Sequence, residues 1–129
     1  MDSSIQLTEE MLSRLLKDFI EKEKTQKNVT IEEIQTAVAT AYSATLSQIL
    51  SSDRTATLVT PRQLAMYITR KFTNKGLQEI AKKFEKSHAT ILHGVKTISK
   101  RLDVEQDLKD NLEKIISQFG YSLDDCIDQ

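Results

Sequence analysis

The chain of 129 residues is about one domain long, with 39% hydrophobic and 29% charged residues, one cysteine, one proline and three glycines. The single cysteine, Cys126, excludes an internal disulfide and favours a reducing compartment. No apolar run approaches the roughly 18 residues of a membrane span, and the first residues lack the features of a signal peptide. We therefore expect a globular cytoplasmic protein.

Charge is distributed unevenly along the chain, although the formal net charge is only −1. Residues 54–101 hold 11 Lys and Arg against 2 Asp and Glu, a net charge of +9, whereas residues 1–53 carry −4 and residues 102–129 carry −6. Such a basic segment is typical of a surface that binds a polyanion. The alternative is a solvated basic face that pairs with the acidic ends.

Helical spacing of apolar residues recurs along the chain, and strand signals do not. A first helix is expected after Thr8, and its apolar stripe consists of Met11, Leu12, Leu15, Leu16, Phe19 and Ile20. A second helix is expected from Thr30, the N-cap of a capping box with Glu33, and a short third helix over residues 43–50. Residues 51–57 are expected to form a loop.

Further helices are predicted downstream of this loop. One begins with Thr60 as N-cap and Pro61 at its first position. A short helix over residues 77–84 and a longer helix capped by Ser87 follow, and a final helix runs from about residue 105 toward Gly120, which stands in a helix-stopping place.

The predicted fold class is all-α: a compact helical bundle of six to seven helices that contains a helix-turn-helix and follows an amphipathic connector helix. We expect the connector over residues 1–28, the packed domain over residues 29–120 and an acidic tail over residues 121–129.

The helix over residues 77–84, the turn at residues 85–87 and the helix from His88 have the proportions of a helix-turn-helix. In this motif the second helix contacts base edges in the major groove near its N-terminal end. At helical spacing its core stripe is Ile91, Val95, Ile98 and Leu102, and its opposite side holds Ala89, His93, Lys96 and Lys100. No acidic residue occurs from Lys86 to Arg101, which suits a face that meets phosphates.

Other chemistry has little support in the sequence. His88 lies between the core stripe and the outer face, where it could contact DNA or form a local hydrogen bond. His93 is five positions away, and no Cys, Asp or Glu nearby completes a metal site, so we expect no metal and no cofactor. Cys126 has no base beside it, and no phosphate-binding glycine loop occurs, so we expect no enzyme activity.

Two stretches, Pro61–Ile68 and Ile80–Gly94, resemble the C-terminal DNA-binding domain of the bacterial chromosomal replication initiator DnaA, and the resemblance extends from about Val29 to Leu102. The second stretch is similar to the family's signature, in which a phenylalanine closes one helix and an Arg-Asp-His-Thr-Thr-Val segment opens the recognition helix. Residues 7–24 look like the end of the family's ATPase lid and its connector helix. The resemblance therefore describes either a C-terminal fragment or a stand-alone relative without the AAA+ ATPase module.

The resemblance implies roles for individual residues. Arg62 looks like the family's arginine that enters the minor groove, and Arg54 falls in the loop that is basic in the family. Lys86 occupies the place of the signature arginine, while His88 and Thr90 match its histidine and its second threonine.

The chain departs from the signature at Ser87, where the family has Asp, and at Ala89, where it has the first Thr; the turn is also one residue shorter. Each such contact is worth about 1–3 kcal/mol of base discrimination if used. The two departures therefore affect which DNA sequence is recognised more than they affect the fold. The predicted DNA-binding residues are Arg54, Arg62, Lys82, Lys83, Lys86, Ser87, His88, Ala89, Thr90, His93, Lys96 and Lys100.

Two functional hypotheses follow. The first is sequence-preferring binding of double-stranded DNA by a monomer, in replication initiation or its regulation, at the nucleoid. The second is a helical adaptor or transcriptional regulator that binds a DnaA-type AAA+ protein through the N-terminal stripe, with DNA contact secondary. That stripe could instead pack on the domain's own core.

Overall fold

The computed structural model describes residues 29–125, so the connector helix expected over residues 1–28 lies outside the described residues, as do residues 126–129 of the expected acidic tail. Within this range the chain is all-α, as predicted, with six α-helices, one 3-10 turn and no strand. None of these helices is long and apolar enough to cross a membrane. The elements are α2 (Ile31–Ala41), α3 (Leu46–Leu50), α4 (Ala56–Phe72), α5 (Leu77–Phe84), α6 (His88–Leu102), α7 (Gln106–Ser117) and η1 (Leu123–Asp125).

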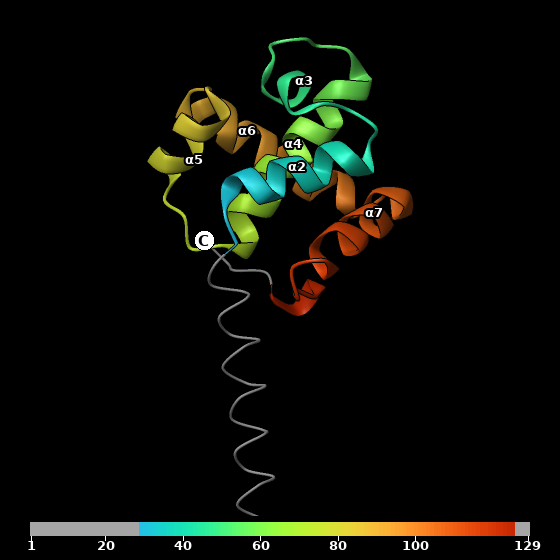
Figure 1. Ribbon diagram of the computed structural model, residues 1–129. Coiled ribbons are helices and arrows are strands. Elements are labelled where there is room, and N and C mark those ends of the chain that lie inside the picture. Colours follow the sequence, from blue (N-terminus) through green and yellow to red (C-terminus); the bar gives the residue numbers. More distant parts are fainter. Residues whose placement is uncertain (1–28, 126–129) are drawn as a thin grey trace, which may run out of the picture.

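Helix α4 is the centre of the bundle. It contacts every other α-helix of residues 29–125, and Figure 1 shows it crossing between α2 and α6, with α3 at one end and α5 and α7 to either side. Its sequence explains this position, because the run from Leu64 to Thr69 is buried at every residue. A helix that buries its whole circumference needs neighbours on all sides.

Side-chain caps set the starts of α2, α3 and α6. Thr30 Oγ1 accepts from the Glu33 N–H at 3.1 Å and Ser87 Oγ accepts from the Thr90 N–H at 3.1 Å, so both predicted N-caps are confirmed. The third helix begins later than the expected residue 43. Ser43 takes a left-handed φ of 55° that ends α2, and a capping box between Thr45 and Gln48 then starts α3.

The predicted start of α4 at Thr60 is wrong. The helix begins at Ala56, and Pro61 lies inside it. The Asp53 carboxylate accepts from both the N–H and the hydroxyl of Thr55, whose carbonyl in turn accepts from the N–H groups of the first helical turn. This turn at Asp53 and Thr55 starts the helix earlier, and Pro61 inside the helix donates no hydrogen bond because it lacks an N–H.

The packed part of the chain continues beyond the expected boundary at residue 120. Gly120 adopts a φ of +82° and ends α7 as predicted, but the following Tyr121 is buried. Its ring contacts Phe72 at the end of α4, with the ring centroids 5.6 Å apart. Tyr121 therefore closes the end of the core between α4 and α7.

Candidate nucleic-acid interface

Helices α5 and α6 and the turn between them match the predicted helix-turn-helix. Helix α5 ends at Phe84, and α6 begins at His88. The connection is tight because Glu85 adopts a left-handed φ of 56°, which lets the Lys86 N–H reach the Ala81 carbonyl at 3.1 Å. This bond pattern is that of a Schellman motif, which usually places glycine at the left-handed position.

The inner side of α6 is seated on the core. Ile91 and Ile98 are fully buried and Val95 is nearly so, as predicted, whereas Leu102 at the end of the predicted stripe is only partly buried against the core. Gly94 faces α4 so closely that a Cβ atom there would lie 2.9 Å from Met66 Sδ. Helix α6 is therefore fixed in position by close contact with the central helix α4.

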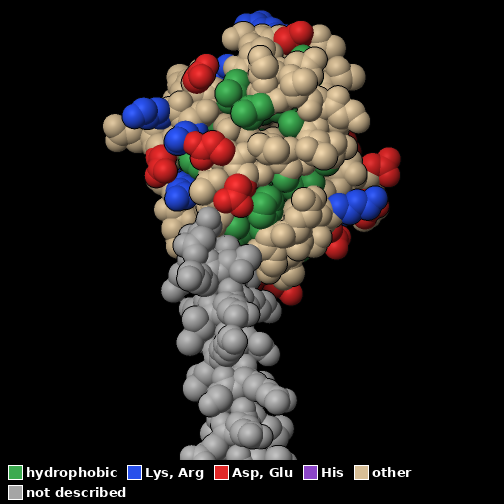
Figure 2. Space-filling view, viewed as in Figure 1, with side chains coloured by type: hydrophobic (Ala, Val, Ile, Leu, Met, Phe, Trp, Pro, Cys, Tyr) green, Lys and Arg blue, Asp and Glu red, His purple; other side chains and the backbone are tan. Residues whose placement is uncertain are grey.

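The outer side of α6 is exposed and carries no acidic residue. The predicted face is confirmed as solvent-exposed, and the neighbouring Leu92 is a large apolar side chain that is 45% exposed. In contrast, the face that carries α2 has acidic and basic side chains interspersed (Figure 2). The exposed residues of this outer face are His88, Ala89, Thr90, His93, Lys96 and Lys100.

A depression of about 550 Å³ lies beside the N-terminal half of α6, and we call it the groove. One wall is the α3–α4 loop, the other is α6 and the turn before it, and the floor is α4. Among its floor residues the sequence singled out Arg62 alone for DNA contact, because the place of the others, Val59, Gln63 and Met66, depends on how α4 and α6 cross. The groove is lined by Ser52, Arg54, Val59, Arg62, Gln63, Met66, Lys86, Thr90 and His93.

The two predicted arginines of the groove differ in exposure. Arg54 is exposed in the α3–α4 loop, within the segment expected to be basic. Arg62, which the resemblance placed in a minor groove, is only 6% exposed. Its guanidinium donates to the carbonyls of Gln48, Ile49 and Asp53 and to Ser51 Oγ, at 2.8–3.2 Å. Burial lowers the pKa of Arg62, although an arginine stays charged in proteins.

Two of the predicted phosphate-binding lysines also have partners within the fold. Lys86 Nζ donates to the Leu50 carbonyl at 3.1 Å, and Lys83 forms a surface ion pair with Glu32 of α2. The hydrogen bond between this pair raises the pKa of Lys83 and lowers the pKa of Glu32. Lys82, by contrast, is exposed.

Ser87 and Thr90 serve the start of α6. Besides its bond to the Thr90 N–H, Ser87 Oγ lies 2.9 Å from Thr90 Oγ1. Both residues are nevertheless exposed, and Thr90 also lines the groove. For His88, whose role the sequence left open, no hydrogen bond is found among the described residues, and the side chain is exposed.

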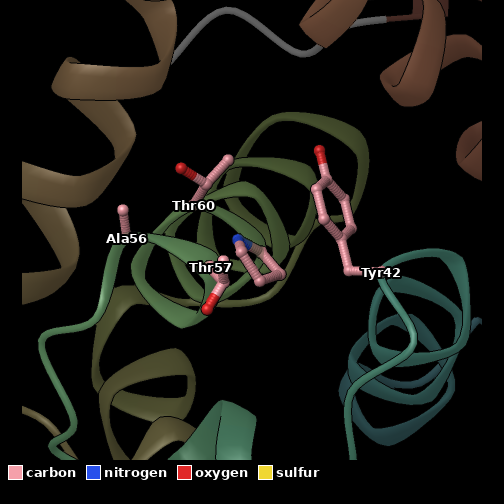
Figure 3. Close-up of a pocket in the computed structure, with 5 residues that line it drawn as sticks. Tyr42, Ala56, Thr57 and Thr60 are labelled. Atoms are coloured by element: carbon pink, nitrogen blue, oxygen red, sulfur yellow. The ribbon is translucent and has the colours of Figure 1, made fainter.

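A second depression, of about 360 Å³, lies between the end of α2 and the first turns of α4. Figure 3 shows Tyr42 on one side and Ala56, Thr57 and Thr60 on the other. None of the residues that line it carries a formal charge. Within residues 29–125, no group of three His, Cys, Asp or Glu side chains is arranged to hold a metal ion.

A short helix, a three-residue turn and a longer helix with one buried and one exposed side define a helix-turn-helix protein. The chain belongs to the family described as bacterial dnaA protein helix-turn-helix, which matches residues 31–98.

Similar proteins carry the same family name. The chain is 39% identical over 107 residues to the chromosomal replication initiator protein DnaA of Ehrlichia ruminantium (strain Gardel), an alignment that covers 82% of this chain and 23% of the relative. It is 41% identical over 106 residues to the protein of that name in Geotalea daltonii, covering 81% and 23%. For Methylacidiphilum infernorum the identity is 37% over 117 residues, covering 90% and 26%. The chain thus spans about a quarter of the length of these curated relatives.

Proposed function

We propose that the chain binds double-stranded DNA by placing the N-terminal half of α6 in the major groove. The observation that carries this proposal is the outer side of α6, which is exposed, free of acidic residues and opposite the buried residues Ile91, Val95 and Ile98. A helix seated so firmly on one side presents its other side as a rigid surface, and a helix of this kind fits the major groove.

The predicted contacts divide by position. Residues at the start of α6 face base edges, and the lysines further along α6 and at the end of α5 face phosphates. For the minor groove we propose Arg54 in place of Arg62, because Arg54 is exposed beside the groove whereas the Arg62 guanidinium is occupied by loop acceptors. The proposed base contacts are His88, Ala89, Thr90 and His93, and the proposed phosphate contacts are Lys82, Lys96 and Lys100.

The test is a titration of labelled duplexes at several salt concentrations, after selection of a preferred site from a random pool. If each of the three proposed lysines neutralises one phosphate, the logarithm of affinity should fall with the logarithm of salt at a slope of about −2.7. The selected duplex should bind more tightly than a scrambled duplex of equal length. Equal affinity for both, or binding insensitive to salt, would contradict the proposal.

We further propose that this activity serves replication initiation or its regulation. The support is family membership and the printed name of the similar proteins, chromosomal replication initiator protein DnaA. On this proposal the domain acts as a monomer at the nucleoid, and by binding rather than by catalysis. A footprint of this protein on the chromosomal DNA of its host would test the proposal. Binding scattered along the chromosome without preference would argue against such a role.

Association with an AAA+ protein is the second candidate, and it rests on the apolar stripe Met11–Ile20. Deleting residues 1–24 separates its two explanations. Loss of binding to the ATPase with unchanged thermal stability supports a docking role, whereas a lower melting temperature supports packing of the stripe on the domain.

A further inference from the structure

The C-terminal end of α3 is held by cationic side chains from distant parts of the chain. The last carbonyls of a helix lack partners inside the helix and attract positive charge. Arg62 of α4 donates to the Gln48 and Ile49 carbonyls, at 3.1 and 2.8 Å, and Lys86 of the helix-turn-helix turn donates to the Leu50 carbonyl at 3.1 Å. Three successive carbonyls of this short helix are thus held from the floor and the far wall of the groove.

The same guanidinium continues into the α3–α4 loop. Arg62 Nη1 donates to the Asp53 carbonyl at 2.8 Å, and Nη2 also reaches Ser51 Oγ at 3.2 Å. On its other side the Asp53 carboxylate accepts from the Thr55 N–H at 2.8 Å. The backbone on both sides of Arg54 is therefore held by hydrogen bonds, and Arg62 supplies the bond to the Asp53 carbonyl from a side chain outside the loop.

Arg54 itself is exposed and lines the groove opposite Thr90 and His93 of α6. An exposed arginine on a free loop would sample many positions and would lose that freedom on binding DNA. A loop held at Asp53 and Thr55 limits this loss. Only a planar fork with several donors can satisfy all of these acceptors at once, so arginine is the residue suited to position 62.

We propose that Arg62 is a positioning residue that holds the α3–α4 loop so that Arg54 faces DNA beside α6, without touching DNA itself. This inference rests on the proposed function. It differs from the role expected from the family resemblance, in which position 62 enters the minor groove.

The test is a double-mutant cycle in the full chain with Arg62→Gln and Arg54→Gln, measured as affinity for the selected duplex at a temperature where every variant is folded. A residue that acts only through Arg54 loses its effect once Arg54 is gone. We expect Arg62→Gln to weaken binding at least tenfold in the native background and less than twofold in the Arg54→Gln background. Equal losses in both backgrounds would indicate direct contact or general loosening and would overturn the proposal.

Lys100→Gln is the matched control, because Lys100 is exposed on α6 and away from the loop. It should weaken binding equally in both backgrounds. Hydrogen exchange gives an independent measurement: the Thr55 amide should lose protection in Arg62→Gln, while amides in the middle of α6 keep theirs. Unchanged Thr55 protection would contradict the proposed hold on the loop.

Arg62→Lys decides the matter if Arg62→Gln does not fold. Lysine keeps the positive charge that a phosphate contact would need but has no fork to span the loop acceptors. We expect Arg62→Lys also to lose affinity only when Arg54 is present, and an undiminished affinity would overturn the proposal. If the native chain binds no duplex, the proposed function itself fails. If it binds and the cycle is additive, only the positioning role fails.

Discussion

The basic residues around the groove fall into two groups, which the structure uses differently. Arg62 on the floor and Lys86 in the turn before α6 donate to carbonyls at the end of α3 and hold it. On the outer side of α6, Lys96 and Lys100 are exposed, and no ion pair involves them within residues 29–125. Charge counted along the sequence therefore overstates the charge available to a ligand, because part of it caps a helix and fixes a loop.

The largest expected effect comes from truncating a core side chain that seats α6 on the bundle. Ile91 is fully buried beneath α6, and Ile91→Ala should lower the free energy of unfolding by about 2–5 kcal/mol. Leu92→Ala, one position further and 45% exposed, is the control and should stay within about 0.5 kcal/mol. Urea unfolding measures both, and similar losses would mean that α6 is seated differently.

A second pair of variants compares a lysine that is hydrogen-bonded within the fold with a lysine that is exposed on α6. Lys86→Met removes the bond to the Leu50 carbonyl and should lower stability by about 1 kcal/mol. Lys96→Met should leave the melting temperature unchanged but make the salt slope of DNA affinity shallower by about 0.9, the effect of one phosphate contact. If Lys96→Met destabilised the fold, the distinction between the hydrogen-bonded and the exposed lysines would fail.

Glu85 lies in the turn between α5 and α6. Its left-handed φ of 56° costs about 1–2 kcal/mol in a residue with a side chain, part of which glycine recovers. We expect Glu85→Gly to raise stability by about 0.5–1 kcal/mol and also to strengthen DNA binding, because a negative charge beside the phosphates is removed. Glu85→Gln should strengthen binding without raising stability.

Ser43→Gly is the matched control for the turn, since Ser43 has the same left-handed conformation at the end of α2. It should gain stability and leave DNA affinity unchanged. An equal gain in affinity would show that stability, and not charge, controls binding.

The smallest expected effect is a loosening of the α3–α4 loop at low pH. Hydrogen bonds from Thr55 lower the pKa of Asp53 below its ordinary value of 3.8, so its stabilising contribution is complete above that value and is lost as pH falls through the folded-state pKa. The loop wall should therefore loosen below about pH 4, whereas α6 contains no carboxylate to titrate. Exchange of the Thr55 amide between about pH 5 and 3 measures this. Asp53→Asn, which still offers an oxygen to Thr55, should flatten the pH dependence, and an unchanged profile would contradict the assignment.

The sequence alone determined the parts of this protein that depend on neighbours a few residues apart. The bounds of α5, the Ser87 cap, and the exposed and buried sides of α6 follow from local hydrogen bonds and from the 3.6-residue period. These signals remain valid wherever the helix is placed, and they were sufficient to predict a helix-turn-helix and its outer face.

Only the tertiary structure decided the start of α4, the place of Arg62 and the groove. Arg62 and its acceptors are separated by 9–14 positions, a spacing that matches no local period. Whether the Arg62 guanidinium contacts DNA or backbone carbonyls depends on how α3 is packed against α4. A buried carbonyl without a hydrogen-bond partner lowers the stability of the fold more than an exposed one does. Folding therefore directs Arg62 inward and leaves Arg54, eight residues earlier, at the surface.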